Sequence, residues 1–110
     1  MEVIKTKTYT LRTESGGWLG QIVLTSDGMF ASVTDYGNLS YAWRSFGDGD
    51  FRKFMSEINV GYLGTKLYTG MAYIVHTKKV EQACDRFAEM ILPALQKVLK
   101  EELNNNVNWD

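Results

Sequence analysis

The sequence contains very few of the residues that build metal centres and covalent cross-links. Among 110 residues there is one cysteine, Cys84, and one histidine, His76. A structural zinc site needs about four Cys or His ligands and a catalytic one about three protein ligands, so a Cys/His zinc site within one chain is excluded. A lone cysteine cannot form an intrachain disulfide. We therefore expect a protein of a reducing cytoplasm that carries no metal and no cofactor.

Long apolar runs and an excess of one charge are also missing. No stretch approaches the ~18 uninterrupted apolar residues of a membrane-spanning helix, and residues 1–5 lack the apolar core of a signal peptide. The 12 basic and 13 acidic residues give a net charge of −1. Proteins that grip phosphate backbones usually carry a clustered basic excess. We therefore expect no membrane association, and we regard nucleic acid as the less favoured partner.

The length and the composition indicate a single domain over residues 1–110. Hydrophobic residues make up 45% of the chain, which is typical of globular proteins and enough for one core. The alternation of apolar and polar residues changes along the chain and divides it into parts. We predict a sheet over 1–45, short helices over 48–68, a long helix over 77–103 and a frayed tail over 104–110, with Trp109 as the exception.

Four short strands are predicted in the first part of the chain. Their ranges are 3–12, 18–25, 29–34 and 39–44, and the segments between them are rich in Gly, Asp and Asn, as tight turns require. Consecutive strands joined by tight turns form an antiparallel meander. The predicted fold class is therefore α+β, with a four-stranded antiparallel sheet and C-terminal helices packed on one face.

The faces of the sheet follow from the lengths of the turns. A two-residue turn at Asp27-Gly28 puts Leu24 opposite Ala31, and a three-residue loop over 36–38 puts Tyr41 opposite Val33. A two-residue loop over 36–37 would instead place Tyr41 with Phe30. We prefer the three-residue loop because it gathers the large apolar residues on the helix-covered face, namely Trp18, Ile22, Leu24, Ala31, Val33, Tyr41 and Trp43.

The helices are predicted from spacing and capping residues. Phe51, Phe54, Met55 and Ile58 follow the i, i+3, i+4, i+7 spacing of an amphipathic helix, which Asp48 or Asp50 would cap and Asn59 would end. Residues 62–67 predict further helical turns before Thr69-Gly70.

The last helix is predicted to begin after Thr77. Its apolar stripe is Val80, Cys84, Phe87, Ile91, Leu95 and Val98. Pro93 lies within the stripe and predicts a kink or a break near Met90. Residues 71–75 fit either a fifth strand or the lead-in to this helix.

No motif for catalysis or for metal binding is present. Asp48 and Asp50 could ligate Ca²⁺ or Mg²⁺, but Arg52 stands where the next ligand of a calcium loop should be, and helix capping explains both carboxylates. His76 has no nucleophile context, and Cys84 on an apolar stripe behaves as a small hydrophobe. We expect a protein that is not an enzyme.

The uncovered sheet face is the candidate binding surface. With the register chosen above it holds Gln21, Val23, Phe30, Ser32, Thr34 and Arg44. Apolar residues on an exposed face indicate contact with another protein or a homo-oligomer. The alternative is a single-stranded nucleic acid that stacks on aromatic side chains, although such platforms normally have basic flanks.

A set of short motifs resembles small bacteriophage and prophage proteins of unknown function. The likeness covers about residues 17–67 and rests on Asp35-Tyr36-Gly37-Asn38, Tyr41 and Trp43, the segment from Phe46 to Phe54, Tyr62-Leu63 and Lys66-Leu67. The resemblance implies a phage-encoded accessory protein in the cytoplasm of the host bacterium. By analogy, such a protein would bind a host protein, for example to inhibit host defence.

Overall fold

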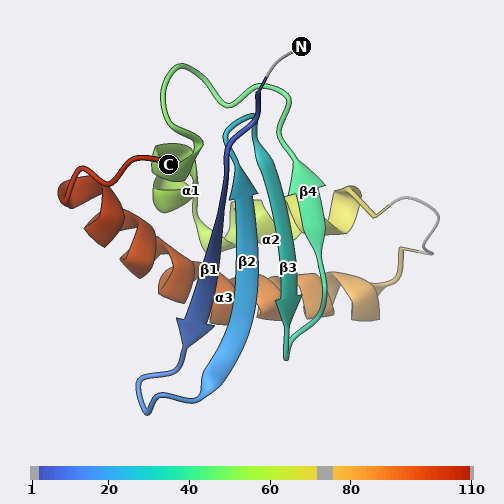
Figure 1. Ribbon diagram of the computed structural model, residues 1–110. Coiled ribbons are helices and arrows are strands. Elements are labelled where there is room, and N and C mark those ends of the chain that lie inside the picture. The colour runs from blue at the N-terminus through green and yellow to red at the C-terminus, as the bar shows by residue number, and fades with distance from the viewer. Residues whose placement is uncertain (1–2, 72–75, 110) are drawn as a thin grey trace.

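The computed structural model describes residues 3–71 and 76–109, and within them it places a four-stranded sheet against three helices. The strands are β1 (Thr6–Arg12), β2 (Trp18–Thr25), β3 (Met29–Thr34) and β4 (Ser40–Ala42). The helices are α1 (Phe51–Glu57), α2 (Val60–Thr69) and α3 (Lys78–Asn104). The sheet order is β1-β2-β3-β4, antiparallel throughout, and the helices lie together on one face (Figure 1). The predicted α+β meander is confirmed.

The core lies between the covered face of the sheet and the apolar stripe of α3. Ile22, Leu24 and Phe30 from the sheet are fully buried, as are Phe87 and Ile91 from α3. The ring of Phe30 meets that of Phe87 edge to face, with 6.3 Å between their centroids. Burying each such side chain contributes about 1.5–3 kcal/mol, so these residues decide which face of the sheet the helices cover.

The β2–β3 register differs by one residue from the predicted one. Leu24 pairs with Phe30, so the loop is Ser26-Asp27-Gly28 and not Asp27-Gly28 alone. Gly28 has a φ of 105°, and a Cβ there would lie 2.3 Å from the carbonyl oxygen of Trp43. A three-residue loop that ends in such a glycine is a common hairpin connection.

This one-residue slip exchanges the faces of β3. Phe30, which was predicted on the uncovered face, is 0% exposed, and Val33, which was predicted in the core, is 56% exposed. Ala31 accompanies Val33 because the two are on the same parity of β3. The predicted positions of Phe30, Ala31 and Val33 are wrong.

Tyr41 and Trp43, the two large aromatic residues in and after β4, lie on the covered face as predicted, but the register of β4 differs from the predicted one. Tyr41 pairs with Phe30 and not with Val33. Trp43 is 5% exposed, and its Nε1 donates to the hydroxyl of Tyr62 at 3.0 Å. The covered-face prediction is confirmed for both residues, but the predicted three-residue loop is wrong, because Thr34 bridges to Gly37 and leaves a two-residue turn at Asp35-Tyr36.

Trp18 is another residue of the sheet whose predicted face differs from the observed one. Leu11 pairs with Gly20 and Arg12 pairs with Trp18, so a bulge in β2 accommodates Leu19 as an extra residue. Leu19 is 6% exposed and joins the core, whereas Trp18 is 41% exposed. The prediction that Trp18 faces the helices is wrong, because a bulge shifts the alternation at the end of a strand.

The short helices begin at side-chain caps. Asp50 caps α1 by accepting the N–H of Arg52 at 2.8 Å, which confirms one of the two predicted caps. Asn59 does not end α1, which stops at Glu57, but caps α2 by accepting the N–H of Tyr62 at 2.7 Å. Of the residues whose spacing predicts the apolar face of this helix, Phe51 and Met55 are buried, whereas Phe54 and Ile58 are only partly buried.

Thr77 caps α3 as predicted, accepting the N–H of Val80 at 3.2 Å. The helix continues through Pro93 without a break and curves along its length (Figure 1). Pro93 and Glu89 are both exposed, so water can reach the carbonyl of Glu89, which the proline leaves without its usual helical donor. The choice between a strand and a lead-in for residues 71–75 falls mostly on 72–75, outside the described residues.

Candidate protein-binding surface

The uncovered face of the sheet is nearly free of charge. Alternation and pairing along the strands assign to it Thr6, Thr8, Thr10, Arg12, Trp18, Gln21, Val23, Thr25, Met29, Ala31, Val33, Ser40 and Ala42. Paired residues form rows across the sheet, such as Thr8, Val23, Ala31 and Ser40. Among these strand residues only Arg12 is charged, and it lies at a corner next to Trp18.

Large apolar side chains on this face reach solvent. Met29 is 47% exposed and Val33 is 56% exposed. Both come from β3, where the observed register turns them outward. The sequence analysis missed them because it assigned this parity of β3 to the core. The signal that could have identified them is Ser26-Asp27-Gly28, which also fits a three-residue loop.

The six residues predicted for this surface do not all lie on it. Gln21 and Val23 do, and Arg44 is exposed just beyond β4. Phe30 is buried in the core. Ser32 and Thr34 share the parity of Phe30 and serve the β3–β4 connection: the Ser32 hydroxyl donates to the carbonyl oxygen of Leu39 at 2.7 Å, and that of Thr34 to Gly37 at 2.8 Å.

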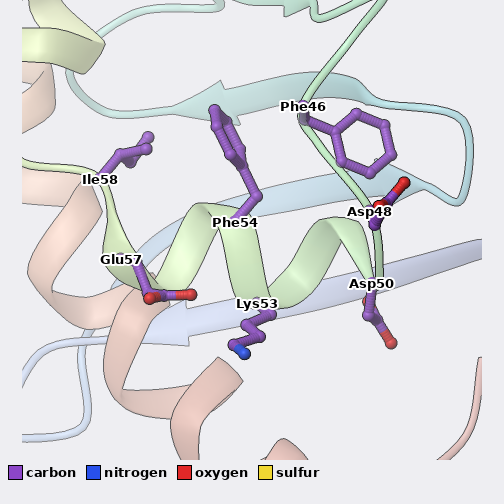
Figure 2. Close-up of a pocket in the computed structure, with 7 residues that line it drawn as sticks. All are labelled: Phe46, Asp48, Asp50, Lys53, Phe54, Glu57 and Ile58. Atoms are coloured by element: carbon purple, nitrogen blue, oxygen red, sulfur yellow. The ribbon is translucent and has the colours of Figure 1, made fainter.

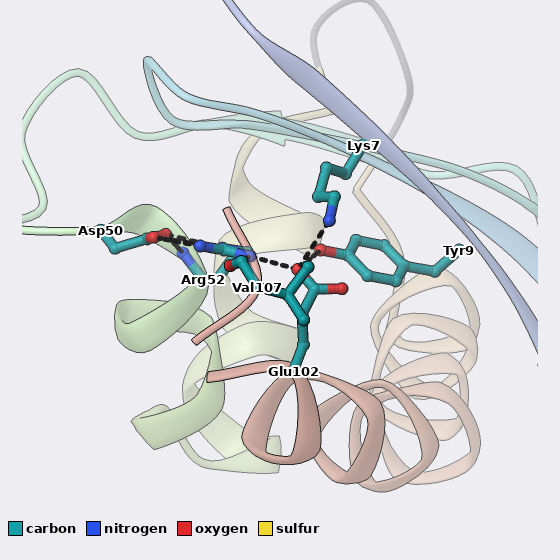
Figure 3. A network of polar contacts seen from close by, with 6 residues as sticks. All are labelled: Lys7, Tyr9, Asp50, Arg52, Glu102 and Val107. Atoms are coloured by element: carbon teal, nitrogen blue, oxygen red, sulfur yellow. Dashed lines mark hydrogen bonds and ion pairs between the residues drawn. The ribbon is translucent and has the colours of Figure 1, made fainter. Parts of the chain in front are cut away.

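A buried polar network lies at the other side of the molecule (Figure 3). The guanidinium of Arg52, a residue only 3% exposed, donates to the carboxylate of Asp50, with 2.6 Å between Nη2 and Oδ2. Its Nη1 pairs with the carboxylate of Glu102 and donates to the carbonyl oxygen of Val107 at 2.9 Å. The Tyr9 hydroxyl also donates to Glu102, at 3.0 Å.

This network ties four segments together. Lys7 and Tyr9 come from β1, Arg52 from α1, Glu102 from α3 and Val107 from the tail. The guanidinium carbon of Arg52 also lies 5.0 Å from the ring centroid of Trp109. We expected the tail to fray except for Trp109, whereas in the structure both Val107 and Trp109 contact Arg52.

The electrostatics of the network keep its carboxylates ionised. Burial alone would raise the pKa of Glu102, but hydrogen bonds from Arg52, Tyr9 and Lys7 outweigh it and hold that pKa below its ordinary value. Asp50 behaves in the same way beside Arg52. Burial and the bond to Glu102 raise the pKa of the Tyr9 phenol. A carboxylate already surrounded by donors is a poor proton acceptor, so the arrangement indicates a structural role.

The carboxylates of the glycine-rich segment line a shallow pocket of about 320 Å³ (Figure 2). Its walls are Phe46, Asp48, Asp50, Lys53, Phe54, Glu57 and Ile58. Asp50 is already engaged by Arg52. Among residues 3–71 and 76–109, no group of three or more His, Cys, Asp or Glu side chains could hold a metal ion. This pocket therefore contains neither a metal centre nor a recognisable set of catalytic groups.

The lone histidine and the lone cysteine occupy unrelated settings. His76 is exposed, and its ring lies 4.6 Å from that of Tyr68, centroid to centroid. Cys84 is fully buried in the core, where burial raises the pKa of its thiol and disfavours the reactive thiolate. Neither geometry provides an activated nucleophile.

Comparison with known proteins gives one match. The model of a phage protein family, Phage_phiTE_072, matches residues 1–83, which include the whole sheet together with α1 and α2. No curated protein and no solved structure matches the chain. None of the helices in the described part of the chain is both long and apolar enough to cross a membrane.

Proposed function

Since the chain belongs to this phage family, we propose that it is a phage accessory protein that acts without catalysis, by binding another protein through the uncovered face of its sheet. The observation that supports this is the near absence of charge on that face together with the exposure of Met29 and Val33. An antiparallel sheet that leaves one face in water usually alternates apolar and polar residues. Here the outward side chains include alanine, valine and methionine beside threonine, serine and glutamine, and Arg12 supplies the charge.

The size and chemistry of the face suit a protein partner. Four strands spaced by about 4.8 Å and some six residues long make a surface of roughly 20 by 20 Å. Arg12 and Trp18 stand at one corner, and tryptophan and arginine are frequent anchors of protein interfaces.

The proposed partner is a protein of the infected bacterium, and inhibition of a host defence protein is one function of this kind. Self-association through the same face is the other use of an uncharged, apolar surface. A single-stranded nucleic acid is less well supported. The aromatic residue assigned to the uncovered face is Trp18, and Arg12 is the accompanying base, whereas stacking platforms combine several rings with a basic groove.

The proposal is tested by affinity capture from infected bacteria with the wild-type chain and two variants. Val33→Asp places a charge on the face beside Gln21, whereas Val33→Thr keeps it uncharged and similar in shape. We expect Val33→Asp to lose the captured protein, or to abolish a dimer, and Val33→Thr to retain it. Equal capture by Val33→Asp and wild type would place the contact elsewhere. A bound nucleic acid, with salt-dependent affinity, would support the alternative.

A further inference from the structure

The β1 edge of the sheet is long and unpaired by any other described strand. β1 has seven residues and pairs with β2 on one side only, whereas the opposite edge strand, β4, has three. Native proteins usually protect an edge with a short strand, a charged side chain, a proline or a bulge in the edge strand itself. β4 is short enough to be protected. β1 contains no proline, the bulge of this hairpin lies in β2, and the inward-pointing charge of Lys7 is paired with Glu102.

The hydrogen bonds of β1 show which of its backbone groups face outward. The Lys5 carbonyl accepts the N–H of Ser26 at 2.8 Å, and the N–H of Thr13 donates to Gly17 at 2.8 Å. Odd-numbered residues of β1 therefore point their backbone groups toward β2. Because these directions alternate along a strand, the N–H and C=O groups of Thr8, Thr10 and Arg12 point away from the sheet.

A groove runs beside this edge, between the end of β1 and α3. Its volume is about 820 Å³, and Leu11, Leu19, Met90, Ala94 and Val98 supply its apolar lining. Met90 is 42% exposed, so the apolar wall reaches solvent. Figure 1 shows the C-terminal half of α3 continuing past β1, from which Lys7 and Tyr9 reach Glu102 in the last turn of the helix. The helical layer is thus wider than the sheet it covers.

The length of the groove follows from its α3 wall. The α3 wall from Met90 to Glu101 spans roughly 16 Å along a helix axis. A strand of about five residues would fill this length, with alternate side chains pointing into the groove.

The charges of the groove and of β1 distinguish between two possible occupants, an uncharged segment of another protein and a second copy of β1. The groove has one base and one acid on each wall, Arg12 with Glu14 and Lys97 with Glu101, so it suits an uncharged apolar segment. A second copy of β1 is disfavoured, because residues 3–12 hold three bases and no acid. Antiparallel self-pairing would bring the bases of two copies to one seam, and although Lys7 is paired with Glu102, the two exposed Arg12 side chains would repel each other.

We propose that the β1 edge and the groove beside it bind an uncharged, extended peptide segment of another protein, which adds to the sheet as a further strand. The backbone groups of Thr8, Thr10 and Arg12 would bond to the segment, and the apolar wall of α3 would receive its alternate side chains. This surface is separate from the uncovered face, so the inference does not depend on the proposed function.

The probe is a blocked synthetic peptide of about seven residues in which threonine alternates with valine. A matched peptide carries N-methyl groups on alternate residues, in both possible phases, and cannot donate to β1. We expect the first peptide to bind and to slow hydrogen exchange at the amides of Thr8, Thr10 and Arg12. The N-methylated peptides should do neither.

Two variants with matched controls locate the site. Thr10→Pro removes an outward N–H without breaking a β1–β2 bond, whereas Thr10→Val keeps it. Met90→Glu adds a charge to the apolar wall, whereas Met90→Leu does not. We expect Thr10→Pro to weaken binding about fivefold and Met90→Glu about tenfold, with both controls near wild type. Val33→Asp should bind the peptide normally, whatever its effect on the uncovered face.

Several outcomes would overturn the inference. They are no binding at about 1 mM peptide, equal binding of the N-methylated peptides, or unchanged binding by Met90→Glu. If Thr10→Pro does not fold, Met90→Glu decides alone. A dimer in sedimentation that Met90→Glu dissociates would make a second copy the occupant and would also overturn it.

Discussion

Arg52 and Glu102 lie 50 residues apart in the chain, and their charged groups meet inside the fold. The contact joins the first turns of α1 to the last turn of α3. Tyr9 and Lys7 of β1 bind the same carboxylate. Because this site connects the sheet, α1, α3 and the tail, we expect it to affect the stability of the whole domain.

Replacing Arg52 should be among the most damaging single changes. Arg52→Ala would leave the carboxylates of Asp50 and Glu102 partly buried without their main partner. Breaking one side of a buried pair costs about 3–5 kcal/mol in the free energy of unfolding. The neighbouring exposed Lys53 is the control, since Lys53→Ala should change stability by less than about 0.5 kcal/mol. Urea denaturation giving similar values for both variants would show that the network adds little.

The same carboxylates predict a loss of stability in acid. The pKa values of Asp50 and Glu102 lie below their ordinary values of 3.8 and 4.5, so the unfolded chain binds protons first as pH falls. Their contribution is present above pH 4.5 and is lost as pH falls through the lowered values of the folded state. Glu102→Gln should be less stable at neutral pH and should lose less stability between about pH 5 and 3. Parallel stability curves for the variant and the wild type would contradict this.

The register of β3 can be tested with the same substitution at two positions. Phe30 is fully buried against Phe87, so Phe30→Asp should prevent folding. Val33 is 56% exposed, so Val33→Asp should give a folded protein within about 1 kcal/mol of wild type. Circular dichroism with thermal melting distinguishes the two. A folded Phe30→Asp variant with an unfolded Val33→Asp variant would restore the register expected from the sequence.

The two phenylalanines of α1 should differ in their contributions. Phe51 is 1% exposed, whereas Phe54 is partly buried and lines the shallow pocket. Phe51→Ala should therefore cost about 3–5 kcal/mol in the free energy of unfolding, and Phe54→Ala about 1–3 kcal/mol. Chemical denaturation of both variants measures the difference. A larger loss for Phe54→Ala would mean that its place in the aromatic cluster matters more than its exposure.

Much of the fold follows from local patterns in the sequence. Alternation located β2 and β3, and capping chemistry located the starts of α1 and α3 at Asp50 and Thr77. These features depend on neighbouring residues only. The faces of the sheet depend on loop length instead, and Ser26-Asp27-Gly28 fits a loop of two or of three residues. That single ambiguity moved Phe30 and Val33 to opposite faces, and with them part of the candidate binding surface.

Long-range polar contacts could not be predicted from the sequence. In the sequence, Glu102 is a charged residue near the end of a predicted helix and Arg52 is a residue of another predicted helix. Nothing in their neighbouring residues indicates that the two pair. Their pairing depends on how α3 lies across β1 and α1, which no periodicity of either segment specifies. The groove beside β1 also depends on how α3 packs against the sheet, because it arises where α3 extends past the sheet edge.

The most direct measurement of the central claim is methyl chemical-shift mapping of the labelled protein with its captured partner, or over a concentration series for self-association. The methyl groups of Val23, Met29, Ala31 and Val33 report on the uncovered face, and those of Met90 and Val98 report on the groove. We expect shifts at the first group and little change at the second when that partner binds. Shifts confined to Met90 and Val98, with the sheet methyls unchanged, would contradict binding through the uncovered face.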